Sequence, residues 1–133
     1  MNNKSKKILS EISIGELLDK ISILEIKLNK IKDPNALIEI NKEYKLLKKV
    51  QNENVESNKK ISELYHSIKE INLTLWRIED EIRICEKNKD FGKKFIELAR
   101  GVYFNNDKRS KIKFEINQLL GSNIKEIKSY QKY

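Results

Sequence analysis

A regular spacing of apolar side chains constrains the fold of this chain more than any other feature. They recur at steps of three and four residues along one segment, as Ile61, Leu64, Ile68, Ile71, Leu75, Ile78, Ile82 and Cys85. This spacing puts them on one face of an α-helix, and a stripe of this length is typical of helices that pack lengthwise on other helices. We therefore predict a long helix that forms the spine of an all-α fold.

The same spacing predicts a helix before the spine, with the stripe Ile14, Leu17, Ile21, Leu24, Leu28 and Ile31. Ser13 and Glu16 form a capping box at its start, because each side chain can satisfy a free backbone N–H group of the other residue. Asp33-Pro34 ends this helix and begins the next, since proline disfavours helix at the preceding residue and suits the first helical position. We expect the two helices to form an antiparallel hairpin.

The second helix of the hairpin is predicted over about residues 34–51, with the apolar stripe Leu37, Ile40, Tyr44 and Leu47. Residues 51–58 read QNENVESN and place polar side chains where the stripe would continue, which predicts a loop. One unbroken helix through to the end of the spine is the alternative, because neither proline nor glycine interrupts this stretch.

Two short helices are predicted after the spine. Asp90 suits the cap of the first, whose buried side would be formed by Phe91, Phe95, Leu98, Val102 and Tyr103. Residues 105–107 read NND and predict a turn, and the last helix would end at Gly121, where a left-handed C-cap costs little. The predicted class is thus all-α: a helical hairpin plus a long third helix in a coiled-coil-like bundle, with two short C-terminal helices.

The length of 133 residues fits one domain. We expect a flexible N-terminal segment over residues 1–12, a single helical-bundle domain over 13–121 and a C-terminal tail over 122–133. Cys85 is the only cysteine, which excludes an internal disulfide, and no apolar run is as long as a signal peptide or a membrane span. These features predict a cytoplasmic protein without a transmembrane segment.

The chain is basic, with a net charge of +8. The excess lies in residues 89–133, which carry 11 basic and 5 acidic side chains. Such an excess is compatible with an anionic partner, and equally with a lysine-rich solvated surface. No recognition signature for nucleic acid accompanies it, so we expect no sequence-specific nucleic-acid binding.

Few residues of the chain suit catalysis. His66 is the only histidine and falls on the solvent side of the spine, and Cys85 continues the apolar stripe as a small buried residue. Glu16 and Asp19 share a helical face and resemble the acids of magnesium-binding helices in all-α nucleotide pyrophosphohydrolases. The second acidic segment follows them instead of preceding them, however, and Glu16 is explained as a cap. We therefore predict no metal site and no cofactor.

The arginines are more informative, because all four fall between positions 77 and 109 of a chain that otherwise uses lysine. The planar guanidinium suits bidentate binding of a carboxylate or a phosphate. One hypothesis is a polar pocket for an anionic small molecule, namely a sugar phosphate, a nucleotide or a dicarboxylate. The alternative is a structural latch of ion pairs that locks the helices together. The candidate residues are Trp76, Glu79, Asp80, Arg83, Arg100, Tyr103, Asn106, Asp107 and Arg109.

Several segments resemble a family of short all-helical proteins of bacteria and their viruses, a family with no assigned activity. They read ISIGELLDKISILEIKLNKI, LWRIEDEIR, FIELARGVYFNNDKR and INQLLGSNIKEIKSY, and the resemblance covers about residues 12–133. It implies that the arginines, Trp76 and the Asn106-Asp107 pair belong to a recurring pattern. It also implies an association with genes for surface polysaccharides and glycosyltransferases.

The sequence as a whole favours a non-enzymatic interaction or accessory module. Its partner would be another protein or a second copy, bound through apolar surface left over from the bundle. The alternative function is the pocket, with Arg83, Arg100 and Arg109 holding an anionic small molecule, in which case the protein could be a small helical enzyme.

Overall fold

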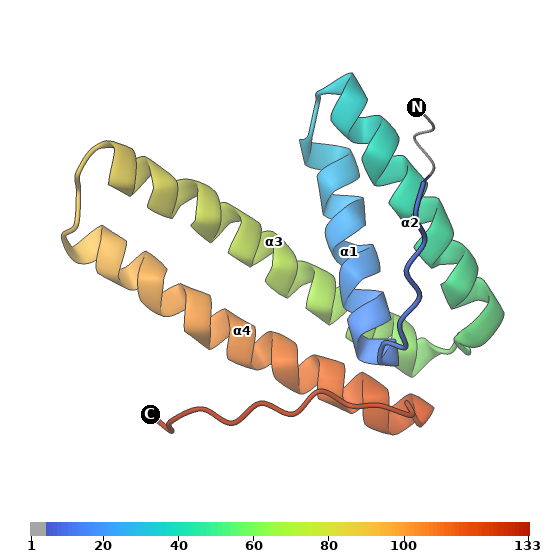
Figure 1. Ribbon diagram of the computed structural model, residues 1–133. Helices are drawn as coiled ribbons and strands as arrows, with labels where there is room; N and C mark the ends of the chain where they lie inside the picture. Colours follow the sequence, from blue (N-terminus) through green and yellow to red (C-terminus); the bar gives the residue numbers. More distant parts are fainter. Residues whose placement is uncertain (1–4) are drawn as a thin grey trace.

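The chain forms four α-helices and no strand within residues 5–133, which the computed structural model describes (Figure 1). The helices are α1 (Ile14–Lys30), α2 (Pro34–Asn54), α3 (Lys59–Lys87) and α4 (Lys93–Leu120). The all-α class expected from the apolar spacing is therefore confirmed. None of these four helices is long and apolar enough to cross a membrane.

The helices are arranged as two hairpins that diverge from a shared base, α1 with α2 and α3 with α4 (Figure 1). The main core lies at this base, where α1 contacts both α3 and α4. It contains Leu17, Leu18, Ile21, Ile61, Leu64 and Ile116. Helix α2 contributes only partly buried side chains to it, Tyr44 and Leu47, and has no fully buried residue. The architecture is thus open, with α2 as its least buried helix.

Side-chain caps set the start of the first three helices. The side chains of Ser13, Asp33 and Asn58 accept hydrogen bonds from the backbone N–H groups of Glu16, Ala36 and Ile61, at 3.1, 3.0 and 2.9 Å. Asn58 shows why α2 and α3 are separate helices, because its cap begins α3 after a break at residues 55–58. A break between the two helices is confirmed, but it is shorter than the predicted loop over residues 51–58 because α2 continues to Asn54. The alternative of one unbroken helix is wrong.

The two short C-terminal helices are corrected to one, because α4 runs without interruption over 28 residues. The expected turn at residues 105–107 lies inside this helix. Asparagine and aspartate each cost less than about 0.7 kcal/mol relative to alanine in a helix. Contacts with α3 along the length of α4 outweigh that cost, and Asn105 Nδ2 donates to the carbonyl of Gly101 one turn earlier at 2.8 Å.

The start of α4 is also corrected. Gly92 is the N-cap and provides no side-chain hydrogen bond, while Asp90 accepts one from the Gly92 N–H at 3.1 Å. Phe91 and Tyr103 were expected on the buried side but are 50% and 44% exposed. The other three predicted contacts, Phe95, Leu98 and Val102, do pack in a second small core with Ile78 and Cys85.

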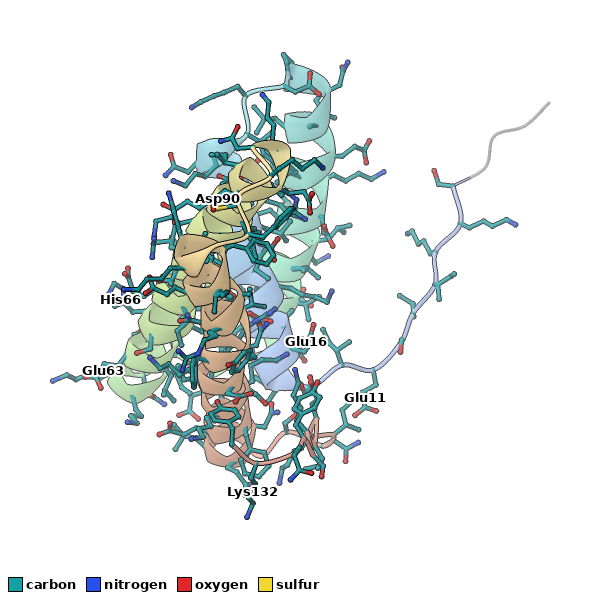
Figure 2. The ribbon with its side chains drawn as sticks, turned by 90° about the vertical axis from the view of Figure 1, so that its left-hand side faces the viewer. Glu11, Glu16, Glu63, His66, Asp90 and Lys132 are labelled. Carbon is teal, nitrogen blue, oxygen red and sulfur yellow. The ribbon has the colours of Figure 1, made fainter. Side chains whose placement is uncertain are left out.

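Two segments outside the helices differ in their contacts. Residues 5–12, called the N-terminal arm below, lead away from the bundle (Figure 2), and Ile8 and Leu9 are 90% and 92% exposed. Residues 122–133, the tail, run back along α4 (Figure 1). Ser122 accepts a hydrogen bond from the Ile14 N–H at 3.1 Å, and the Tyr133 hydroxyl donates to Asp107. The tail is therefore attached to the bundle, whereas the arm projects from it.

The first turn of α1 docks closely on α4. The Gly15 N–H donates to Asn117 Oδ1 at 2.6 Å, and Asn117 is 1% exposed. A Cβ atom at Gly15 would lie 2.5 Å from the carbonyl oxygen of Lys113, which belongs to a helix backbone and cannot move aside. Glycine is thus required at this position by the close approach of two backbones.

We predict that Gly15→Ala destabilises the protein by about 1–3 kcal/mol, as overpacking of a tight contact does. Chemical denaturation monitored by circular dichroism would measure the change. Gly101→Ala is the matched control, because its Cβ would meet only the flexible end of Ile78 at 3.0 Å and alanine favours the helix. Equal losses in both variants would contradict the close-approach explanation.

Candidate functional site

The carboxylate of Asp19 is completely buried at the point where α1, α3 and α4 meet. Arg109 Nε lies 3.0 and 3.1 Å from its two oxygens, and Arg109 Nη2 also donates to it. Asn72 Nδ2 donates to Asp19 at 2.8 Å and to the Ser22 hydroxyl at 2.8 Å. Each oxygen of the buried carboxylate therefore has a donor, as a charge removed from water requires.

Lys113 extends this cluster toward the surface. Its Nζ donates to Glu16 at 2.6 Å and to Glu126 of the tail at 3.2 Å, and lies 3.6 Å from Asp19. Burial alone would lower the pKa of Lys113, but the hydrogen bond to Glu16 and the charges of Asp19 and Glu16 outweigh burial and raise the pKa above its usual value. Lys113 is therefore a charged residue although it is only 8% exposed.

A polar cavity of about 250 Å³ opens beside these ion pairs. The residues around it come from α1, from α4 and from the tail, and its walls are almost entirely polar. They are Glu16, Asn106, Arg109, Ser110, Lys113, Glu126 and Lys128. Glu16 and Asp19 were considered above as metal-type acids, but both are engaged by cations, and no metal-type group of acids, histidine or cysteine occurs in residues 5–133. The chemistry available is hydrogen bonding and charge pairing.

A second polar cluster joins α1, α2 and α3. The Glu25 carboxylate accepts hydrogen bonds from the hydroxyls of Tyr44, at 3.0 Å, and of Tyr65, and Lys69 Nζ lies 3.4 Å away. Burial, then the hydrogen bond to Glu25 and the charge of Glu25, raise the pKa of Tyr65 above its usual value. This cluster fastens the two hairpins to each other.

The sequence-predicted site residues lie in three different settings. On α3, Arg83 pairs with Glu79 one turn away, both exposed, while Asp80 is exposed and Trp76 partly buried. On α4, Arg100 stacks over Phe104, and Tyr103 lies in an aromatic group with Phe104 and Tyr133 beside Asp107. Asn106 and Arg109 line the polar cavity. Of the nine residues, the structure thus brings these last two to the Asp19 cluster.

Several residues of the cluster were not singled out from the sequence, among them Asn72, Lys113, Glu126 and Lys128. Asn72 had a signal, because it lies four residues after Ile68 on the buried face of the spine, where a polar side chain needs a buried partner. Glu126 and Lys128 lie in the segment INQLLGSNIKEIKSY, which carries the resemblance to the family. Lys113 had no signal, since lysine is this chain's common surface residue.

Residues 8–133 match the family described as "Family of unknown function (DUF6165)". The chain belongs to this family. No curated protein and no solved structure match it.

We predict that Arg109→Met destabilises the fold by about 3–5 kcal/mol, because it leaves the buried carboxylate of Asp19 without its charge partner. Urea denaturation would measure the loss. Arg83→Met is the control, since an exposed pair one helical turn apart contributes at most about 0.5 kcal/mol. A small effect of Arg109→Met would contradict a structural role for the ion pair.

The Glu25 cluster predicts a loss of stability at alkaline pH. The raised pKa of Tyr65 means that the folded protein holds the phenol proton more tightly than the unfolded chain does. The contribution of Tyr65 to the free energy of unfolding is therefore fully present below pH 10.0, the usual pKa, and is lost as the pH rises above it. Urea midpoints from pH 8 to 11 should therefore fall less steeply in Tyr65→Phe than in the wild type. Lysines titrate in both proteins, so the difference isolates Tyr65, and identical slopes would contradict the prediction.

Proposed function

We propose that the protein is a helical interaction module that pairs with a second copy of itself. The observation that carries this proposal is its accessible surface of 10008 Å². A compact monomer of 15.8 kDa exposes about 7,300 Å². The difference is larger than the roughly 800 Å² that each partner buries in a standard protein interface. This excess is spread over the projecting arm, the exposed tail and the open pair of hairpins.

The N-terminal arm is the part of this surface best suited to a contact. Ile8 and Leu9 are among the most exposed large apolar residues of the chain, and both lie within the region that matches the family. Each such side chain stabilises a complex by about 1.5–3 kcal/mol when it is fully buried. In a two-fold symmetric dimer every contact occurs twice. The arm therefore offers substantial binding energy that the single chain does not use.

A groove on α2 is the surface that we assign to the arm of the second copy. It has a volume of about 590 Å³ and is lined by Pro34, Leu37, Ile38, Asn41, Lys42 and Lys45. The five extended residues of the arm from Ile8 to Ile12 span about 13 Å. The nine helical residues from Leu37 to Lys45 span about 12 Å. The lengths match, and the contact would cover the helix that the single chain buries least.

The biological setting is part of the same proposal. The free thiol of Cys85 is compatible with a reducing compartment, and we propose the cytoplasm. The resemblance stated for the family adds an accessory role beside enzymes that build surface polysaccharides in bacteria and their viruses. In this role the module would act by binding and not by catalysis.

We predict that sedimentation velocity will show a monomer–dimer equilibrium at protein concentrations between about 1 and 200 µM. A dissociation constant at the lower end of this range corresponds to a binding free energy of about 8 kcal/mol. The double variant Ile8→Asp with Leu9→Asp should remain monomeric throughout, because it charges the arm and leaves the bundle intact. Ile38→Asp in the groove should have the same effect.

Ile84→Asp provides the control, because Ile84 is 55% exposed at the far end of the other hairpin. It should dimerise like the wild type. A wild-type protein that stays monomeric at 200 µM would refute the proposal, and an arm variant that still dimerises would refute the assigned surface.

A further inference from the structure

The tail holds a carboxylate between two lysines. Glu126 lies 3.2 Å from Lys113 Nζ and 3.5 Å from Lys128 Nζ, although its side chain is 42% exposed. Residues 125–133 form neither helix nor strand. The ion pairs hold the side chain of Glu126, and the preceding residue is held by the hydrogen bond from Lys125 Nζ to Gln118 Oε1 at 2.8 Å. Partial burial alone would raise the pKa of Glu126, but the hydrogen bonds and charges of Lys113 and Lys128 together outweigh burial and lower the pKa. The structure thus shows where an anionic group is bound at the rim of the cavity.

The charges around the cavity favour an anion at this place. Without Glu126, the site contains three cations, Arg109, Lys113 and Lys128, and two carboxylates, Glu16 and Asp19. Glu126 supplies the missing negative charge from an exposed and irregular segment. The other two carboxylates belong to α1 and are held in the packed base of the bundle. Glu126 is therefore the one acid of the site that a ligand can replace without disturbing a helix.

The remaining walls of the cavity supply uncharged hydrogen-bond donors and one further donor group of the Arg109 guanidinium. Arg109 uses Nε and Nη2 for Asp19, while Nη1 has only a long contact of 3.4 Å with Asn106 Oδ1. Ser110 and the amide of Asn106 also line the cavity. Guanidinium, hydroxyl and amide groups together suit the oxygens of a carboxylate or a phosphate and the hydroxyls of the molecule that carries it. The volume of about 250 Å³ suits a small ligand.

We infer that the position of Glu126 is an anion-binding subsite for the carboxylate or phosphate of a small polar molecule, and that Glu126 is its intramolecular competitor. The ligand displaces the Glu126 side chain and binds between Lys113 and Lys128. Ser122, which accepts a hydrogen bond from the Ile14 N–H, stays in place during this exchange. This inference does not depend on dimerisation.

The test uses inorganic phosphate and malonate as probes of the two chemistries, titrated into the full chain at constant ionic strength. Binding is followed by calorimetry and by ¹H–¹⁵N spectra. If Glu126 occupies the subsite most of the time, the apparent affinity for the probe equals the intrinsic affinity multiplied by the fraction of molecules in which the subsite is free. We therefore expect Glu126→Gln to bind one of the probes about tenfold more tightly than the wild type does.

Two lysine variants complete the test. Lys128→Gln should bind the probe at least severalfold more weakly than the wild type. Lys111→Gln changes an exposed lysine of α4 that does not line the cavity, and it should bind the probe like the wild type. A response to phosphate alone identifies a phosphate subsite, and a response to malonate alone identifies a carboxylate subsite. The inference is overturned if Glu126→Gln gains no affinity, or if Lys111→Gln loses as much as Lys128→Gln.

Discussion

The buried ion pair of Asp19 and Arg109 is the interaction on which the arrangement of the helices depends. A carboxylate that is fully removed from water costs several kcal/mol, and this cost is met only where Arg109 and Asn72 reach it together. Those two residues lie on different helices, so the requirement fixes the rotation and the register of α1 against α3 and α4. The leucine and isoleucine contacts of the core at the base have no such directionality. The apolar core stabilises the association of the helices, and the ion pair determines in which rotation and register they pack.

Part of this fold could be predicted from the sequence. The all-α class and the break before Asn58 follow from local patterns of a few residues, and so do most of the apolar faces, although Phe91 and Tyr103 were assigned to the wrong side of α4. The continuity of α4 does not, because residues 105–107 favour a turn locally and only packing against α3 holds them in a helix. Helix propensity decides where a helix ends only in segments on which nothing else packs. In the other segments, tertiary contacts decide it.

The polar site was less readable for a related reason. Arginine stood out against the lysine background, and Arg109 was identified as a residue of interest by its chemistry alone. Its partner Asp19 lies 90 positions earlier in the chain, and spacing within one helix carries no information about such a contact. Lys113 illustrates the limit, since it is the same residue type as the exposed surface lysines and differs only in being enclosed by Glu16, Asp19 and Glu126.

The tail connects the structural role of this site with the binding role that we infer for it. Ser122 satisfies the first turn of α1, and four residues later Glu126 neutralises Lys113, so adjacent parts of one segment serve stability and charge balance separately. An anion that takes the place of Glu126 keeps Lys113 paired, and the buried Asp19 keeps Arg109. Binding therefore has no large electrostatic cost to the fold, while residues 125–133 lose one of their attachments to α4. By thermodynamic linkage, attachment of the tail through Glu126 weakens ligand binding by the same free energy as ligand binding weakens this attachment. Because the ion pairs at the base persist in both states, this exchange is confined to the tail and leaves the four helices in place.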